Sequence, residues 1–234
     1  MKQILQNHKG LVQKVFDRVS NKYDVMNDFM SLGIHRLWKK DLVNMMSPSK
    51  NTKLIDVGCG TGDIGKIFLD SVNYYGDVYN VDPNKNMINA GKKKFKNIKN
   101  IKWFVNSAEN LQFEDNFFDF YTISFGLRNT KNIEKSIKEA FRVLKPGGKF
   151  LCLEFSKVQN DNFRKIYKEY SKLIPKIGKL IVGEKEPYEY LVESIDKFIN
   201  QEELLDCMNK NNFIKCKYRN FNGGIVAIHS GWKV

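Results

Sequence analysis

The sequence lacks several features that would place the chain in a membrane or around a metal. Among its 234 residues there is no run of eighteen apolar residues, so we predict no membrane-spanning helix. Residues 1–10 have no apolar stretch typical of a secretory signal peptide, and we expect a cytoplasmic protein. Only four cysteines and three histidines occur, none at a CxxC or zinc-ligand spacing. We therefore predict free thiols and no metal site.

Acidic residues are too few to balance the basic ones, and the formal net charge is +13. A basic surface suits an anionic membrane or a nucleic acid. The excess consists mainly of lysine, and asparagine and isoleucine are also plentiful. An AT-rich genome would impose that bias on any protein surface, so the charge alone does not identify a partner.

The order of apolar segments indicates an α/β fold. Short apolar runs at 54–57, 78–81, 101–105, 120–124 and 150–155 read as buried strands, with helices predicted at 64–72, 86–94 and 133–144. Helices are also predicted at 11–19, 34–45, 163–181 and 202–208. Two last strands, 213–220 and 225–229, are joined by a hairpin signal at 221–224. This pattern predicts a mostly parallel, seven-stranded sheet closed by a C-terminal antiparallel hairpin.

A glycine-rich segment, DVGCGTGD at 56–63, follows the first predicted strand and opens a helix. A phosphate-binding P-loop is excluded because the segment lacks the GK[ST] ending. A dinucleotide site would have glycine at 63, where Asp63 would instead repel a pyrophosphate. S-adenosylmethionine carries no phosphate but has an ammonium and a cationic sulfonium, so the acidic Asp56 and Asp63 favour it. The glycines Gly58 and Gly60 allow the backbone to approach such a ligand closely.

Further polar residues follow the other predicted strands, at the edge where open α/β sheets bind ligands. Asp82 lies about 20 residues beyond the glycines, the spacing at which a carboxylate meets ribose hydroxyls. Ser107 and Ala108 follow the third strand, where an adenine edge would lie, and Ser124 ends the fourth. Ser124 could equally cap a helix. Together these residues predict a Rossmann-like class I methyltransferase.

Longer motifs resemble the ubiquinone/menaquinone biosynthesis C-methyltransferase family. YDVMNDFMS at 23–31, followed by His35 and Trp38, is similar to one family signature, and RVLKPGGKF at 142–150 is similar to the other. ISFGLRN at 123–129 resembles the family's substrate-side loop, and residues 224–231 are also similar. The resemblance covers residues 11–233. Two departures, Gln112 where the family often has proline and Pro83 after Asp82, do not touch the reacting atoms.

The resemblance implies S-adenosylmethionine as cofactor and a 2-polyprenyl-6-methoxy-1,4-benzoquinol or a demethylmenaquinol as methyl acceptor. It carries the cofactor contacts onto Thr61, Asp82, Ser107 with Ala108, and Ser124. It also implies one domain in three parts: an N-terminal helical lid at 1–50, a cofactor-binding core at 51–156, and substrate-side helices with the closing hairpin at 157–234.

The expected catalytic residues lie just beyond the fourth strand. A quinol ring becomes a better nucleophile as its hydroxyl loses a proton, so a site must stabilise phenolate charge. Arg128 is the first candidate because a guanidinium stays charged, and Asn129 would orient the same group. The alternative is an arginine that merely pairs with a surface carboxylate. The expected substrate contacts are Tyr23, Asp24, Asn27, His35 and Tyr188, with His229 a weaker candidate.

Partners and rival functions follow from the same residues. The segment LIPKIGKLIV at 173–182 could contact the inner membrane peripherally or be an ordinary buried amphipathic segment. A nucleic-acid methyltransferase is disfavoured because SFGL at 124–127 replaces [ND]PP[FY] and no cysteine lies near that loop, so no nucleic-acid partner is expected. A small-molecule O- or N-methyltransferase is the other rival. A homodimer and a quinone-biosynthesis complex both stay open, as does the choice between the two quinols.

Overall fold

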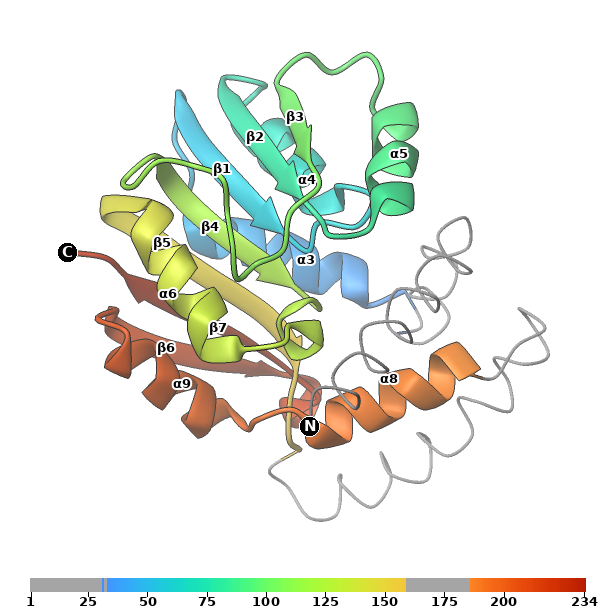
Figure 1. The fold of residues 1–234 in the computed structure, drawn as a ribbon, viewed down its shortest axis with the longest axis vertical. Coiled ribbons are helices and arrows are strands. Elements are labelled where there is room, and N and C mark those ends of the chain that lie inside the picture. Colours follow the sequence, from blue (N-terminus) through green and yellow to red (C-terminus); the bar gives the residue numbers. More distant parts are fainter. Residues whose placement is uncertain (1–30, 32, 159–185) are drawn as a thin grey trace.

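A computed structural model describes residue 31, residues 33–158 and residues 186–234. Their centre is one seven-stranded sheet in the order β3-β2-β1-β4-β5-β7-β6 (Figure 1). All neighbouring strands pair in parallel except β7, which is antiparallel to both β5 and β6. The strands are β1 Thr52–Val57, β2 Gly76–Val81, β3 Ile101–Phe104, β4 Phe118–Ser124, β5 Leu144–Phe155, β6 Ile214–Phe221 and β7 Val226–Trp232.

Helices cover both faces of this sheet. The helices are α3 His35–Met46, α4 Asp63–Ser71, α5 Lys85–Lys94, α6 Ile133–Val143, α8 Glu186–Lys197 and α9 Gln201–Lys210, with short 3-10 turns η1 Leu127–Asn129 and η2 Asn222–Gly224. Apolar side chains of α3 and α4 pack against one face of the sheet. Those of α6 and α9 pack against the other. Both layers are required because strands of a parallel sheet are apolar on both faces.

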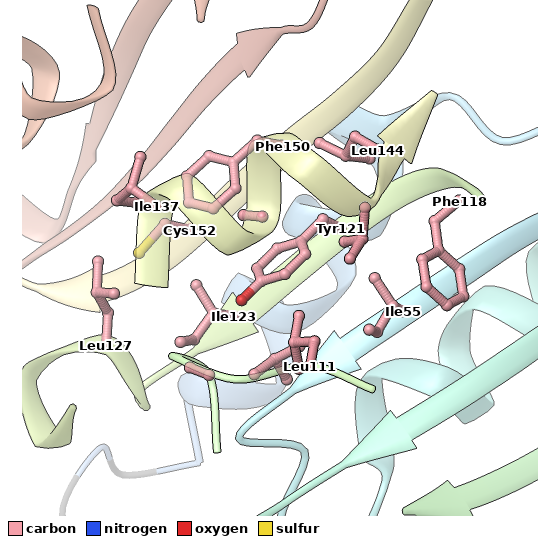
Figure 2. Packing of buried hydrophobic residues seen from close by; sticks show 14 of the residues in the cluster. Ile55, Leu111, Phe118, Tyr121, Ile123, Leu127, Ile137, Leu144, Phe150 and Cys152 are labelled. Atoms are coloured by element: carbon pink, nitrogen blue, oxygen red, sulfur yellow. The ribbon is translucent and has the colours of Figure 1, made fainter. Parts of the chain in front are cut away.

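The core on the α6 side consists of side chains from β1, β4 and β5 beneath the helix, as Figure 2 shows. Tyr121 and Phe150 stack there with ring centroids 5.4 Å apart. Ile137 and Ala140 of α6 close this cluster from above, and both are fully buried. The spacing of these two residues places them on one helical face, which fixes the helix along the strands.

The predicted sheet and its closing hairpin are confirmed, with boundaries mostly within two residues. One strand differs clearly: β5 begins at Leu144, six residues before the predicted start of the strand at 150. Leu144 already pairs with Phe118 of β4. The residues that follow it form an irregular part of the strand. There the Gly147 N–H donates to the Lys233 carbonyl, and the Lys233 N–H donates to the Gly148 carbonyl. The prediction missed α8. The predicted helices at 11–19 and 163–181 lie outside the described residues.

Two expectations about absences concern the described residues. In the ranges given above, none of the helices combines the length and hydropathy that crossing a bilayer requires. The same residues contain no cluster of three or more side chains suited to hold a metal ion. All four cysteines are free, as predicted.

Candidate active site

The glycine segment forms a tight turn between β1 and α4, at the carboxyl end of the sheet (Figure 1). Gly58, Gly60 and Gly62 have φ angles of 65°, 55° and 89°. This left-handed region disfavours residues with a Cβ. A Cβ on Gly62 would also stand 2.6 Å from the Trp103 ring. Glycine is therefore required here for conformation and for space. Within the turn, the N–H groups of Cys59 and Gly62 donate to the carbonyls of Val81 and Cys59.

Asp82 holds this turn from the neighbouring strand. One carboxylate oxygen accepts the Gly60 N–H at 2.9 Å, and the other accepts the Asn84 N–H at 2.8 Å. Burial raises the pKa of the Asp82 carboxyl to about 6, although both N–H bonds act in the opposite direction. A carboxylate offers about four acceptor sites. Each oxygen thus retains a lone pair after bracing the turn.

Asp56, the last-but-one residue of β1, is buried with one unpaired oxygen. Thr122 of β4 donates its hydroxyl to Oδ1 at 2.8 Å, whereas Oδ2 has no hydrogen bond to any residue that the structure describes. Burial raises the pKa of Asp56 to about 7, opposed by the Thr122 bond and by the charge of Lys39. An unpaired buried carboxylate oxygen is costly and calls for a cationic or hydrogen-bonding ligand.

Asp63 plays a different part from the one expected. It begins α4, and its two oxygens accept Lys39 of α3 and Lys94 of α5, each at 2.8 Å. Burial would raise the pKa of Asp63, but the two lysines outweigh it and hold the pKa well below its usual range. The expectation that Asp63 supplies free negative charge to the cofactor is not supported, because its charge is balanced. Lys39 was not singled out from the sequence.

The other predicted cofactor residues lie along the same edge. Thr61 and Ala108 are buried, and Ser107 forms an isolated bridge with Asn110. The hydroxyl of Ser124, at the end of β4, is buried and has no hydrogen-bond partner within residues 33–158 and 186–234. A Cβ placed on Gly58 would lie 3.5 Å from the Cα of Gly126, so the glycine turn and the loop after β4 are in contact.

The loop after β4 is built around an unusual backbone. Phe125 has a φ of 54°, which for a bulky residue is a genuine outlier and costs energy. This conformation aims its carbonyl back at η1. There it accepts Nη1 of Arg128 at 2.6 Å and Nδ2 of Asn129 at 3.4 Å. Both predicted catalytic residues are therefore held by the Phe125 carbonyl, in the loop whose Gly126 contacts the glycine turn.

Arg128 is paired with a buried carboxylate. Its Nη1 lies 2.7 Å from Oε1 of Glu154, and its backbone N–H donates to Oε2 at 3.3 Å. The side chains are 4% and 2% exposed. Burial raises the pKa of Glu154, and the charge of Arg128 lowers it. Nη2 makes no hydrogen bond to any described residue, so the guanidinium keeps one donor group for a ligand.

Two α8 residues that the sequence prediction missed also contact η1. Tyr190 donates its hydroxyl to Oδ1 of Asn129 at 2.9 Å, and Nε of Arg128 donates to Oγ of Ser194 at 3.3 Å. The spacing of Tyr188, Leu191 and Ile195 after a proline at 187 could have indicated this helix.

The remaining candidates are dispersed. His35 begins α3 and is buried, and its backbone N–H donates to the Ser31 hydroxyl. Tyr188 is buried in α8, and its hydroxyl has no hydrogen-bond partner among the described residues. His229 lies inside β7 with Nε2 at 3.0 Å from the Gln201 carbonyl, and burial lowers its pKa to about 4, which argues against a base. The expected contacts Tyr23, Asp24 and Asn27 lie outside the described residues.

Solved structures with the same architecture define the class. A methyltransferase from Thermotoga maritima that uses S-adenosylmethionine superposes with a TM-score of 0.67 at 20% identity, covering 95% of this chain and 99% of that one. The phosphoethanolamine N-methyltransferase 2 of Haemonchus contortus, solved with S-adenosylhomocysteine, superposes at 0.63 with 16% identity, covering 84% of this chain and 52% of that one. These similarities show that the fold is that of the class I methyltransferases.

Sequence comparison gives the particular family. The model of the ubiE/COQ5 methyltransferase family matches residues 2–233. The ubiquinone/menaquinone biosynthesis C-methyltransferase UbiE of Rickettsia akari is 47% identical over 97% of this chain and 94% of that protein. The protein of the same name from Brucella abortus strain S19 is 46% identical over 100% of this chain and 89% of that protein. The chain belongs to the ubiE/COQ5 methyltransferase family, as its motifs predicted.

Proposed function

We propose that this chain methylates a ring carbon of a polyprenylated quinol, a benzoquinol or a naphthoquinol of ubiquinone or menaquinone biosynthesis. The observation that carries the proposal is the contact between the cofactor turn and the loop that holds Arg128. Gly58 and Gly126 touch there, so a methyl donor on one loop would stand beside a substrate held by the other. The relatives' names support the choice of a carbon acceptor and a quinol.

The edge of the sheet fits S-adenosylmethionine. Asp56, with its unpaired Oδ2, suits a cationic group of the cofactor, and the spare lone pairs of Asp82 suit ribose hydroxyls. The glycine turn leaves room for close backbone contact. Thr61, Ser107, Ala108 and Ser124 complete the proposed binding set. When bound, the cofactor supplies an electrophilic methyl group.

The residues of η1 act on the quinol. Loss of the hydroxyl proton to solvent places negative charge on the quinol oxygen and makes the ring carbon a nucleophile. Once that carbon carries the methyl group, its hydrogen leaves as a proton and the aromatic ring is restored. Because Glu154 balances the charge of Arg128, we assign the arginine the role of a directed hydrogen-bond donor through Nη2, to the quinol oxygen directly or through one water. Asn129 orients the same oxygen. His35 and Tyr188 are proposed to contact the ring or its tail.

The test is methyl transfer from labelled S-adenosylmethionine to three acceptors: a methoxy-polyprenyl benzoquinol, a demethylmenaquinol and bulk RNA. We expect label in a quinol, dependent on reductant, and a loss of about 10²–10³-fold in kcat for Arg128→Ala, as when an oxyanion donor is removed. Arg142→Ala is the matched control, because Arg142 pairs with Glu139 and Asp115 on α6 and the adjoining surface, away from the turn. Label in RNA alone would refute the quinol assignment.

The N-terminal part of the chain completes the proposal. Of the predicted lid at 1–50, the helix α3 packs against the sheet and belongs to the core layer. We propose that the residues before α3 cover the core at 51–156, with Tyr23, Asp24 and Asn27 reaching the substrate. We also propose peripheral contact of 173–182 with the inner membrane from the cytoplasmic side, aided by the net charge of +13. Cosedimentation with anionic liposomes at low salt tests the membrane contact, and a protein that stays in the supernatant would count against the contact.

Light scattering would decide between a monomer, a homodimer and a larger complex.

A further inference from the structure

The helix α8 contacts both residues to which we assign the substrate chemistry. It lies beside η1 in Figure 1, and two of its side chains reach across. Tyr190 and Ser194 are four residues apart and so share one face of the helix. Each meets a different partner, Asn129 for the tyrosine and Arg128 for the serine.

The tyrosine bond defines the orientation of the Asn129 amide. Nδ2 of Asn129 faces the Phe125 carbonyl at 3.4 Å and must be the donor there, so Oδ1 faces Tyr190. The Tyr190 hydroxyl, 2.9 Å away, is then the donor. Without that hydroxyl the amide loses the partner of its oxygen and can rotate.

The hydrogen bond to Ser194 fixes the orientation of the Arg128 guanidinium. Ser194 donates its own hydrogen to the Leu191 carbonyl at 2.8 Å, which leaves its oxygen free to accept Nε of Arg128 at 3.3 Å. Glu154 and the Phe125 carbonyl both bind Nη1. Both of these contacts are made at Nη1 of the planar guanidinium. The bond from Nε to Ser194 is a second point of attachment, which prevents the group from rotating about Nη1.

The end of α8 is itself anchored to the sheet. Lys157, which follows β5, donates its Nζ to the carbonyls of Ile195 at 3.0 Å and Asp196 at 2.6 Å. A cation on the last carbonyls of a helix is favourable for the helix dipole. The hydroxyls of Tyr190 and Ser194 therefore stand on a fixed support, as positioning residues need.

We propose that Tyr190 and Ser194 are positioning residues for methyl transfer, which hold Asn129 and Arg128 in their working orientation from outside the cofactor-binding core. The inference rests on the proposed function, because it takes these two partners to serve the quinol. It predicts that loss of either hydroxyl lowers kcat and leaves cofactor binding unchanged, since the bonds in question run to Asn129 and Arg128 of η1.

The variants are Tyr190→Phe, Ser194→Ala and Ser194→Thr, which restores a hydroxyl. Two controls remove equivalent bonds elsewhere. Ser71→Ala breaks a hydroxyl bond to a carbonyl three residues earlier in α4, and Tyr218→Phe breaks a hydroxyl bond to Glu202 on the hairpin side. For each variant we would measure kcat and KM for the quinol, the Kd for S-adenosylhomocysteine and the melting temperature.

We expect kcat to fall about tenfold for Tyr190→Phe and for Ser194→Ala, with recovery in Ser194→Thr and no change in the controls. The effect of Tyr190→Phe on kcat should vanish in an Asn129→Ala background, because Tyr190 acts on methyl transfer through its bond to Asn129. Equal kcat in all variants, or a loss that the controls share, would overturn the inference while the quinol activity of the unaltered protein stood. An unaltered protein that methylates neither quinol would overturn both proposals.

Discussion

Asp56 should destabilise the free protein and yet be needed for the cofactor. Its carboxyl is buried, accepts one hydrogen bond and has an unpaired oxygen. Ionising such a group without a cationic ligand is unfavourable, and burial is the main reason that its pKa rises from 3.8 to about 7. The change to test is Asp56→Asn, which keeps the shape and the acceptor for Thr122 but removes the charge.

The sign and size of the effect follow from this pKa. An acid whose pKa is raised in the folded state binds its proton more tightly there than in the unfolded chain. Its contribution to stability is therefore complete below pH 3.8 and is lost as the pH rises to about 7. Each tenfold change in proton affinity corresponds to about 1.4 kcal/mol, so the loss is on the order of 4 kcal/mol. At pH 8 Asp56→Asn should be the more stable protein, by roughly 10 °C at most.

The assay is thermal denaturation at pH 5 and pH 8, with and without S-adenosylhomocysteine. Because Asp82 and His229 also have shifted pKa values, the difference between variant and unaltered protein is the quantity to compare. We expect that difference to be large at pH 8 and small at pH 5, and the ligand to stabilise only the unaltered protein at pH 8. Asp70→Asn, at an exposed pair with Lys66 on α4, is the control. A difference independent of pH would refute the reasoning.

Three further predictions concern the turn, the hairpin and the buried pair. Gly62→Ala should cost about 2–4 kcal/mol in urea unfolding, because the Cβ meets Trp103, whereas Gly147→Ala, with φ of 81° and open space, should cost only about 1 kcal/mol. Burial lowers the pKa of His229 from 6.5 to about 4, so the protein loses about 3 kcal/mol as the pH falls through that range; His229→Gln should remove this loss in urea titrations at pH 7 and pH 4. Glu154→Gln should lower the melting temperature by leaving the Arg128 charge unpaired, whereas Glu134→Gln, at an exposed pair with Lys138, should not.

The sequence was sufficient for the sheet and the cofactor turn because both depend on local patterns. Short apolar runs bounded by glycines predicted the strands. The position of Asp82 directly after β2 was enough to place its carboxylate beside the glycine turn. The pairing of Arg128 with Glu154 could not be predicted from local sequence patterns. The two residues are 26 positions apart and meet only because β4 and β5 are neighbours. The partners on α8 come from more than 60 positions away.

Three unfavourable features lie at the edge where the cofactor would bind, although others, such as the left-handed Tyr74 and the unpaired Nδ1 of His229, lie elsewhere among the described residues. The unpaired oxygens of Asp56 and Ser124 and the left-handed Phe125 all lie where β1 and β4 end. Deeper in the same strands, Ile55 and Tyr121 are buried in apolar packing (Figure 2). A protein tolerates buried unpaired groups and backbone strain only where the rest of the fold supports them, and function is the usual reason that they persist. The three features at the edge that the glycine turn defines are of this kind, so stabilising substitutions placed there should reduce activity, whereas those placed beneath α6 should not.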